Sequence, residues 1–290
     1  MNLNNIHAFI EVAATGNFNR AADNLHVTQS TVSARIKSLE TDIGMALFER
    51  GHAGARLTPA GQQFRQYALG MQQLWQQAHQ AVTLRRGFHG MLGIGAQVSL
   101  WEQLILDWIP WMRLRLPNTA LRIEADYSTS LMRQLHDGLL DIGVMYQPRQ
   151  TPGLKVEMLL EETLVMVSTR QRALQPGWVE DYVYVDWGDV YRARHGEAFP
   201  DMETPAVSVG LGALGLQYIV RNGGSGYFPL RVVLPKIEAG QLFRLEGAPV
   251  IHRPAYVVYR ASHREPEVQR MALEGLRQIA RRESLAEQEH

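Results

Sequence analysis

Residues 28–44 carry the pattern that most restricts what this chain can fold into. At about 100° per residue, a helix over residues 29–43 has one narrow apolar stripe, formed by Val32, Ile36, Leu39 and Ile43. Thr28 stands where an N-cap belongs, and Gly44 stands where the helix should end. The opposite face carries only small or polar side chains, which are Ser30, Ala34, Lys37 and Thr41. Such a slim face fits a DNA major groove, where short side chains let the backbone approach phosphates.

The segments around this helix predict a winged helix-turn-helix over residues 1–58. An amphipathic pattern predicts a first helix that ends at Thr15, and a short second helix follows with Asn19 as its N-cap. Residues 47–50 and 55–58 flank a Gly-His-Ala-Gly turn, which is typical of a β-hairpin. A hairpin directly after two helices and a turn is the wing of this class of domain.

Residues 59–90 predict a long helix followed by a linker. Thr58 and Pro59 are typical of a helix start, and Gly87–Gly90 is the candidate linker. Apolar side chains recur about every 3.5 residues, a spacing that predicts pairing with a second copy of the helix. The residues expected at this dimer contact are Phe64, Tyr67, Met71, Leu74 and Ala78. The alternative is that the same stripe packs onto its own winged helix.

From residue 91 the pattern changes to alternating strands and helices. Strands are expected at 91–96, 120–127 and 141–145, with helices at 100–116 and 129–140 between them. This βαβαβ order predicts a parallel sheet with helices on both faces. A second α/β unit begins near residue 182, so the fold class is α/β overall, and residues 91–290 form one C-terminal domain.

Composition excludes several kinds of chemistry. The chain has no cysteine, which rules out disulfides, thiolate metal sites and a cysteine nucleophile. The ten histidines show no ligand spacing, so we expect no metal and no cofactor. Gly223, Gly224 and Gly226 indicate a turn rather than a phosphate loop, because no Lys-Ser or Lys-Thr follows. Glu161 and Glu162 are neighbours in a strand region and point to opposite faces, so we expect no catalytic carboxylate pair and no enzyme.

The charge distribution favours a DNA-binding front end. Basic and acidic residues balance over the whole chain, but residues 1–90 contain eight Lys and Arg against five Asp and Glu. We find no secretory signal pattern and no apolar run long enough to span a membrane. A cytoplasmic protein without membrane contact is therefore expected.

The first 65 residues resemble the LysR-type transcriptional regulators. The positions that carry the resemblance are Phe9, Val12, Gly16, Phe18, Ala21, Ala22, Leu25, Thr28, Gln29, Ser30, Val32, Ser33, Ile36, Leu39, Glu40, Gly44, Leu47, Phe48, Arg50, Leu57, Thr58, Ala60 and Gly61. The resemblance continues weakly beyond Gly90. It implies a regulator that binds double-stranded DNA as a homo-oligomer, a dimer or a tetramer, on a dyad-symmetric operator. It also implies RNA polymerase as a further partner.

Nine residues are expected to contact DNA, and these are Thr28, Gln29, Ser30, Thr31, Ser33, Ala34, Lys37, Arg50 and Arg56. Gln29 near the helix start can pair with adenine N6 and N7. Lys37 suits a phosphate, and Arg50 and Arg56 suit phosphates or the minor groove. Without the family resemblance, these residues would be read as an ordinary solvated surface.

The resemblance also implies a bilobal effector domain similar to type 2 periplasmic solute-binding proteins. Its lobes are expected at 91–163 with 264–290, and at 164–263. The cleft between them would hold a small-molecule effector, contacted by Gln97, Ser99, Leu100, Trp101, Ser128, Thr129, Tyr146 and Gly210. Ser99 and Ser128 each follow a strand and precede a helix, where backbone N–H groups favour a carboxylate, although simple N-capping needs no ligand. Trp101 shares a helical face with Ile105, Trp108 and Met112, which more often indicates core.

Short matches at Gly95–Ala96, Ser99–Glu102 and Asp186–Gly188 are similar to a LysR-type subgroup that represses flagellar master genes. Two alternatives to the effector-responsive regulator stay open. One is a DNA-binding regulator whose α/β domain serves only as an oligomerisation scaffold. The other is a solute-binding α/β protein whose N-terminal helices only dimerise.

Overall fold

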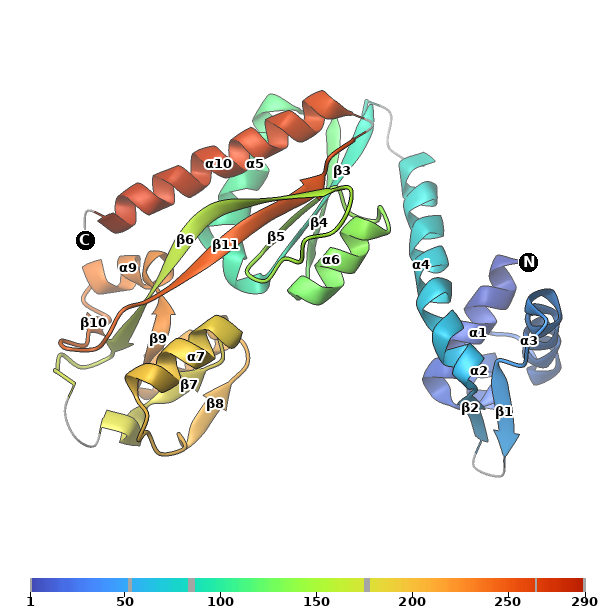
Figure 1. Ribbon diagram of the computed structural model, residues 1–290, viewed down its shortest axis with the longest axis horizontal. Coiled ribbons are helices and arrows are strands. Elements are labelled where there is room, and N and C mark those ends of the chain that lie inside the picture. Colours follow the sequence, from blue (N-terminus) through green and yellow to red (C-terminus); the bar gives the residue numbers. More distant parts are fainter. Residues whose placement is uncertain (1, 52–53, 83–86, 175–177, 264, 289–290) are drawn as a thin grey trace. The chain divides into compact units, whose positions relative to one another are not determined.

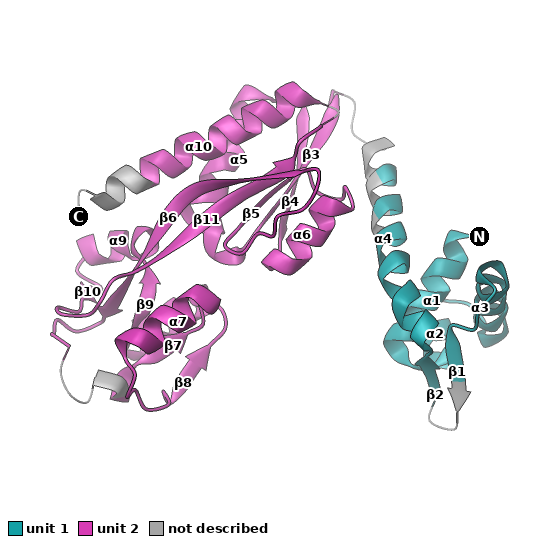
Figure 2. Cartoon of the chain, viewed as in Figure 1, with its two compact units in different colours: residues 1–86 teal, residues 87–290 magenta. Residues whose placement is uncertain are grey.

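The computed structural model describes residues 2–51, 54–82, 87–174, 178–263 and 265–288. The chain forms two compact units, residues 1–86 and 87–290, and each is described by itself (Figure 2). The first unit begins with helices α1 (Leu3–Thr15), α2 (Phe18–Asn24) and α3 (Gln29–Ile43). Strands β1 (Phe48–Gly51) and β2 (Gly54–Leu57) pair in an antiparallel hairpin, and helix α4 (Pro59–Val82) follows. The predicted winged helix-turn-helix is therefore confirmed.

Two local expectations for the first unit are wrong. The N-cap of α2 is Asn17 rather than Asn19, because the Asn17 side chain accepts hydrogen bonds from the N–H groups of Asn19 and Arg20. Ile43 was assigned to the buried stripe of α3, but its side chain is 37% exposed. Ile43 is the last residue before the Gly44 cap, where the helix has passed the end of the core.

The core of the first unit joins the hairpin to the helices. The ring of Phe9 lies 5.2 Å from that of Phe48 and 5.0 Å from that of Phe64. The Glu40 carboxylate at the end of α3 accepts hydrogen bonds from the N–H groups of Leu47 and Phe48, at 2.7 and 3.2 Å. The start of α4 is fixed by Thr58, whose hydroxyl oxygen accepts a bond from the Gly61 N–H. The orientation of α3 therefore follows from both packing and a charge-assisted anchor.

The second unit is built on a seven-stranded sheet of mixed direction (Figure 1). Its parallel part consists of β4 (Thr119–Ala125), β3 (Gly90–Ala96) and β5 (Ile142–Met145), with β3 in the middle. Two long antiparallel strands continue the sheet, β11 (Ile251–Arg260) beside β5 and β6 (Leu154–Ser168) beside β11. The other strands are β9 (Ser225–Pro229) and β10 (Phe243–Arg244), both paired with the end of β6. The expected βαβαβ order is present.

The long strands β6 and β11 run through both halves of the second unit (Figure 1). Residues 256–259 of β11 pair with β5, so they belong with the first half rather than with the 164–263 segment expected for the second lobe. The second half also contains a parallel pair of strands, β7 (Val183–Val185) and β8 (Val207–Val209). Its helices are α7 (Asp189–Ala198), α8 (Gly212–Asn222) and α9 (Leu230–Glu238).

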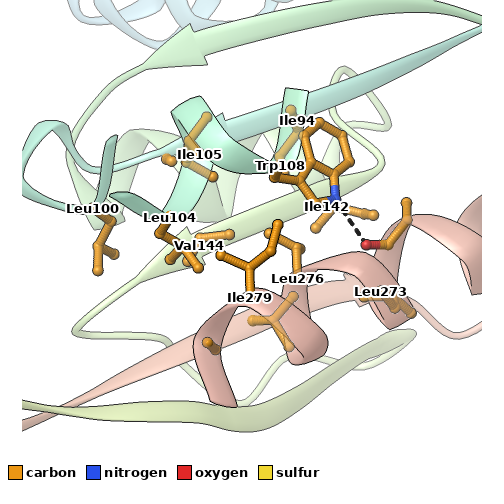
Figure 3. Packing of buried hydrophobic residues seen from close by; sticks show 14 of the residues in the cluster. Ile94, Leu100, Leu104, Ile105, Trp108, Ile142, Val144, Leu273, Leu276 and Ile279 are labelled. Atoms are coloured by element: carbon orange, nitrogen blue, oxygen red, sulfur yellow. Dashed lines mark hydrogen bonds between the residues drawn. The ribbon is translucent and has the colours of Figure 1, made fainter. Parts of the chain in front are cut away.

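Helices α5 (Leu106–Arg115) and α10 (Pro266–Gln288) pack together on one face of the sheet, and α6 (Ser128–His136) packs on β5 from the other (Figure 1). Trp108 lies at the centre of the α5–α10 contact, fully buried among aliphatic side chains (Figure 3). Its indole N–H donates a hydrogen bond of 2.9 Å to the carbonyl oxygen of Ala272. Trp108 and Met112 were expected to be core residues, and both are completely buried.

The continuous helix expected at residues 100–116 is wrong. A 3₁₀ turn covers Val98–Leu100, an irregular segment covers Trp101–Ile105, and the α-helix begins only at Leu106. Gln103 has φ of 62°, which breaks the helical backbone. The Arg231 guanidinium binds the carbonyl oxygens of Ser99 and Glu102, and these carbonyls are thereby drawn away from helical hydrogen bonding.

His195 lies in an aromatic core of the second half and is only 3% exposed. Its Nε2 lies 2.8 Å from the Tyr182 hydroxyl, which lies 3.0 Å from the Tyr191 hydroxyl. The rings of Tyr184, Phe199 and Tyr227 also contact the imidazole. Burial lowers the pKa of His195 from 6.5 to about 4, since the protonated ring has lost its hydration there.

We predict that His195 makes the stability of the second unit fall in acid. Because the pKa of the folded state is depressed, the contribution of neutral His195 is complete above pH 6.5 and is lost as the pH falls toward 4, by about 3 kcal/mol. His195→Gln should reduce the pH dependence of the unfolding free energy by that amount. Urea titrations followed by tryptophan fluorescence measure it, since five of the six tryptophans lie in this unit. An unchanged pH dependence in the variant would contradict the assignment.

Candidate DNA interface and ligand cleft

Helix α3 presents the expected polar face to solvent. Val32, Ile36 and Leu39 are buried, whereas Gln29 and Lys37 are exposed. Among the other residues expected to contact DNA, Thr28, Ser30 and Ala34 are exposed, and Thr31 and Ser33 are half-buried. The packing of α3 thus uses one side of the helix only, and the opposite side is available to a large partner.

Hydrogen bonds between side chains order the start of this face. The Thr28 hydroxyl oxygen accepts the N–H of Thr31 at 3.2 Å and lies 2.9 Å from the Ser30 hydroxyl. One turn further on, the Gln29 amide donates to the Ser33 hydroxyl at 2.9 Å. Gln29, Ser33 and Lys37 stand four residues apart, so they form a single row along the helix. Such a row can follow the edges of successive bases in a major groove.

The hairpin supplies further positive charge. Arg56 is exposed on β2. Arg50 lies in β1 opposite Ala55, while its side chain lies outside the described part of the structure, as do His52 and Ala53 at the turn. Strand β2 is fixed to the rest of the unit, because the Ala55 N–H donates to the carbonyl oxygen of Gly16 at 2.8 Å.

The apolar stripe of α4 is divided between two environments. Phe64 and Met71 pack against the core of their own unit, and this contact occupies the part of the stripe nearest the hairpin. Tyr67 is 64% exposed and Leu74 is 57% exposed, and Trp75, which the sequence pattern did not single out, is 51% exposed. Ala78 is exposed as well. Packing onto its own unit therefore accounts for Phe64 and Met71, whereas pairing of Tyr67, Leu74 and Ala78 with a second copy stays a prediction.

The second unit contains a cleft with a volume of about 520 Å³. It lies between loops of the first half, which follow β3, β4 and β5, and residues of the second half near the starts of α7 and α8. Six of the eight expected effector contacts line it, and these are Gln97, Ser99, Ser128, Thr129, Tyr146 and Gly210. Lining residues that were not among the expected effector contacts include Gln147, Asp186, Trp187, Arg192 and Arg253.

Two of the expected effector contacts point into the core instead. Leu100 is completely buried in the cluster around Trp108. Trp101 packs against the same cluster, and its indole N–H donates to the carbonyl oxygen of Ala96 at 3.3 Å. Neither residue is among those that line the cleft. Leu100 ends the 3₁₀ turn Val98–Leu100 and Trp101 begins the irregular segment, so both lie where the chain turns from the cleft toward the core.

A buried charge cluster forms the floor of the cleft. Glu162 of β6 is fully buried, and Arg231 and Arg253 are 3% and 2% exposed. The Glu162 carboxylate lies 2.6 Å from Arg231 and 2.5 Å from Arg253, and it accepts a hydrogen bond from the Tyr146 hydroxyl at 3.0 Å. Of this cluster, sequence patterns singled out only Tyr146 as a cleft residue, because the members are separated by up to 107 positions along the chain.

The charge state of Glu162 follows from its two arginine partners. Burial alone would raise the pKa of Glu162, but the charges of Arg253 and Arg231 outweigh burial and lower it, so the carboxylate is ionised. Burial and the neighbouring Glu162 charge raise the pKa of Tyr146 far above its usual value, so the phenol is neutral. The Glu162 carboxylate is therefore shared by the guanidinium groups of Arg231 and Arg253. At the mouth of the cleft, Arg192 is instead paired with Asp186 and Asp189.

Comparison with known proteins agrees with this architecture. Residues 3–62 match the family model of the bacterial regulatory helix-turn-helix protein, lysR family, and residues 85–281 match the LysR substrate binding domain. The HTH-type transcriptional regulator HdfR of Salmonella schwarzengrund is 28% identical over 257 residues, which cover 88% of this chain and 90% of that protein.

Solved structures show the same fold. The LysR family regulator CbnR, described in complex with its target DNA, has a TM-score of 0.71 at 20% identity, with 97% of this chain and 100% of CbnR covered. Full-length LysG from Corynebacterium glutamicum, described with bound effector Arg, has a TM-score of 0.53 at 20% identity, with 95% and 98% covered.

A helix-turn-helix unit joined to a two-part α/β domain with a cleft defines a transcription regulator of the LysR type. The chain belongs to the LysR family. It is a DNA-binding regulator with an effector-binding domain, and the family is not one of enzymes. None of the helices in the described part of the chain combines the length and the apolar character that crossing a bilayer requires.

We predict that Gln29 and Lys37 contribute to DNA binding in different ways. Gln29→Ala should weaken binding to a specific site by about 1–3 kcal/mol and should relax the base preference at one position. Lys37→Ala should weaken binding to all sequences and should lower the salt dependence by about one released counterion. Gel shifts on sites selected from random duplexes, at several salt concentrations, measure both effects. Lys155→Ala, an exposed lysine of the other unit, is the control, and equal effects of all three changes would contradict the prediction.

Proposed function

We propose that this protein regulates transcription as a homo-oligomer on dyad-symmetric operators, and that a small molecule in the cleft modulates it. The observation that carries the DNA-binding part is the exposed polar row of α3, held by a buried opposite face and by the Glu40 anchor. The structures of CbnR with its target DNA and of LysG with its effector support the two parts separately, each for its own protein.

The exposed half of the α4 stripe supports the homo-oligomer. Tyr67, Leu74 and Trp75 are large apolar side chains that are more than half exposed on one helix. Contiguous exposed apolar surface of this kind marks an interaction site. A second copy of α4 is the simplest partner, because a twofold contact between identical stripes buries the exposed apolar side chains of both copies. Two DNA-binding units joined in this way would read a site with twofold symmetry.

The effector enters the proposal through the cleft of the second unit. A concave site with convergent polar groups is the usual place for a small ligand. The two halves are connected by the long strands β6 and β11, so a ligand that contacts both halves would favour one relative arrangement. Only such a difference in affinity between arrangements can shift the activity of the regulator.

The remaining expectations fit this role. A regulator of this kind acts on chromosomal DNA, so we place the protein in the cytoplasm, with RNA polymerase as a further partner. The similarity to HdfR agrees with the expected subgroup of flagellar master-gene repressors. Membership of this chain in that subgroup stays a prediction. A thermal-shift screen with small carboxylates that yields no hit would favour the scaffold alternative, in which the α/β domain binds no ligand.

We predict a footprint with twofold symmetry. Genome-wide mapping of bound sites, followed by footprinting on the strongest of them, should give two related half-sites about one helical turn or a multiple of it apart. The reason is that two α3 helices, related by a twofold axis, face the same side of the duplex. Protection of a single half-site without a symmetric partner would contradict oligomeric binding.

We predict that Leu74→Glu separates the copies. A charged side chain at an apolar contact would lose its hydration, so the dissociation constant of the dimer should rise by roughly tenfold or more, with a parallel loss of DNA affinity. Sedimentation at several concentrations measures the first effect and gel shifts measure the second. Met158→Glu is the matched control, since Met158 is an apolar residue of the other unit with a similar exposure of 59%. An unchanged dimer would place the oligomer contact elsewhere.

A further inference from the structure

We propose that the peptide bond between Glu102 and Gln103 is a two-position switch, which Arg231 holds in a reversed orientation against the local preference for helix. Its release would let the irregular segment Trp101–Ile105 join helix α5 and would move the adjoining wall of the cleft. The inference rests on the proposed function for its regulatory meaning, because it names a device through which the cleft can act.

The backbone of the segment departs from a helix at a single peptide plane. Glu102 has φ of −61° and ψ of 131°, and Gln103 has φ of 62° and ψ of −15°. These angles define a type II turn, and rotating the same peptide by about half a turn gives a type I turn, which continues a helix. Trp101 and Ile105, on either side, have helical angles. One peptide flip therefore separates the observed segment from a helix that is continuous from Trp101 onward.

Gln103 is a poor residue for the reversed orientation. A type II turn needs a positive φ at its third residue, where glycine or asparagine is favoured because a larger side chain crowds the backbone. The side-chain oxygen of Gln103 is also buried without a hydrogen-bond donor among the described residues. Both features raise the free energy of the reversed orientation. The reversed peptide is therefore maintained by contacts from elsewhere in the fold.

The sequence of the segment itself favours a helix. Residues 100–105 are Leu, Trp, Glu, Gln, Leu and Ile, and none of these is a strong helix breaker such as glycine or proline. Periodicity predicts one continuous helix over residues 100–116. Local preference and folded structure thus disagree at this point, and such a conflict is typical of a functional or strained site.

Arg231 supplies the contact that offsets this conflict. It is 3% exposed in the first turn of α9, and its Nη1 donates to the carbonyl oxygen of Glu102 at 2.6 Å. Its Nη2 donates to the carbonyl oxygen of Ser99 and to the Glu162 carboxylate. The Glu102 carbonyl belongs to the reversed peptide, and in the helical orientation it would point along the helix axis instead. The bond from Arg231 to this carbonyl is therefore made only in the reversed orientation.

The segment connects the cleft with the core of the first half. Val98 and Ser99, directly before it, line the cleft. Leu104 and Ile105, at its end, are completely buried in the main core cluster of this unit. A movement of the Arg231 guanidinium would free the backbone on both sides, so the cleft wall and the start of α5 would change in one step. A two-state element of this kind gives a ligand the difference between conformations that modulation requires.

The first test uses the sign of a glycine substitution in the full chain. Glycine lowers stability inside a regular helix but raises it where φ is positive. Gln103→Gly should therefore raise the thermal midpoint of the second unit by about 2–4 °C. Gln217→Gly is the matched control, because Gln217 is exposed within the regular helix α8, and it should lower the midpoint by a similar amount. An unchanged or lower midpoint in Gln103→Gly would overturn the proposal.

The second test detects the two positions of the peptide by fluorine NMR. The tryptophans are replaced by 5-fluorotryptophan, and the Trp101 resonance is assigned as the one that Trp101→Phe removes. Gln103→Gly should keep the resonance position of wild type. Gln103→Val should populate a second position, because a β-branched residue disfavours positive φ. If the Trp101 resonance of Gln103→Val coincides with that of wild type, the peptide has no second position and the proposal is wrong.

Arg231→Lys tests the contact that holds the switch. Lysine keeps the positive charge beside Glu162, but it lacks the planar fork that binds several acceptors at once. The Trp101 resonance should move to the same second position as in Gln103→Val, because both changes favour the helical orientation. Agreement between two unrelated substitutions excludes a purely local effect of the new side chain. If Arg231→Lys fails to fold, the Gln103 variants still decide whether the switch exists.

Arg253→Lys is the matched control for this variant. Arg253 binds the same Glu162 carboxylate, but no hydrogen bond joins it to Ser99 or Glu102 within the part of the chain that the structure describes. The Trp101 resonance should therefore stay at its wild-type position. A shift in Arg253→Lys without one in a folded Arg231→Lys would contradict the role assigned to Arg231.

Gel shifts on a specific site separate this inference from the proposed function. Because the switch acts on regulation, Gln103→Gly and Gln103→Val should differ in affinity for that site by roughly fivefold or more. Equal affinities would overturn the regulatory meaning of the switch and leave the regulator intact. Absence of specific DNA binding in wild type, with the thermal and fluorine results as expected, would overturn the proposed function and leave the switch.

Discussion

The carboxylate of Glu162 is the point on which the ligand cleft depends. It lies in the long strand β6 and binds Arg253 of β11, Arg231 of α9 and the hydroxyl of Tyr146. Removing one partner from a buried charge cluster is costly, because the remaining charge has lost its water. Arg231 extends the influence of this carboxylate to the backbone of Ser99 and Glu102, since it binds both carbonyl oxygens. The floor, one wall and the irregular segment before α5 are therefore fixed together.

In the DNA-binding unit, the position of helix α3 depends on a small number of contacts on one side of the helix. Helix α3 must be held firmly while one complete face stays free for the duplex. Three buried aliphatic residues pack its inner face against the core, and the Glu40 carboxylate near its C-terminal end binds the N–H groups of Leu47 and Phe48. Small and polar residues can then occupy the outer face, because none of them is needed for packing. Because packing and DNA contact use different faces of α3, the polar face can be recognised in the sequence.

Sequence patterns predicted the elements whose signals are local. Periodicity and caps gave α3 from Thr28 to Gly44, and alternation gave the βαβαβ order of the second unit. The irregular backbone at Trp101–Ile105 was not predictable, since its cause is Arg231, about 130 positions away. Glu162 was judged from its neighbour Glu161, whereas its role comes from partners on α9 and β11. Long-range charge pairs of this kind leave no periodic trace, so the cleft walls were predictable and the cleft floor was not.

Arg253 connects the two halves of the second unit. Arg253 lies on β11 where this strand passes between them, and it already binds the carbonyl oxygen of Trp187 in the second half and packs on Tyr146 in the first. Gln147 of the first half and Asp189 of the second also meet, at 3.0 Å, across the mouth of the cleft. Because residues of both halves line the cleft, a ligand there would favour the arrangement in which it contacts both halves best, which is the differential affinity that an effector requires.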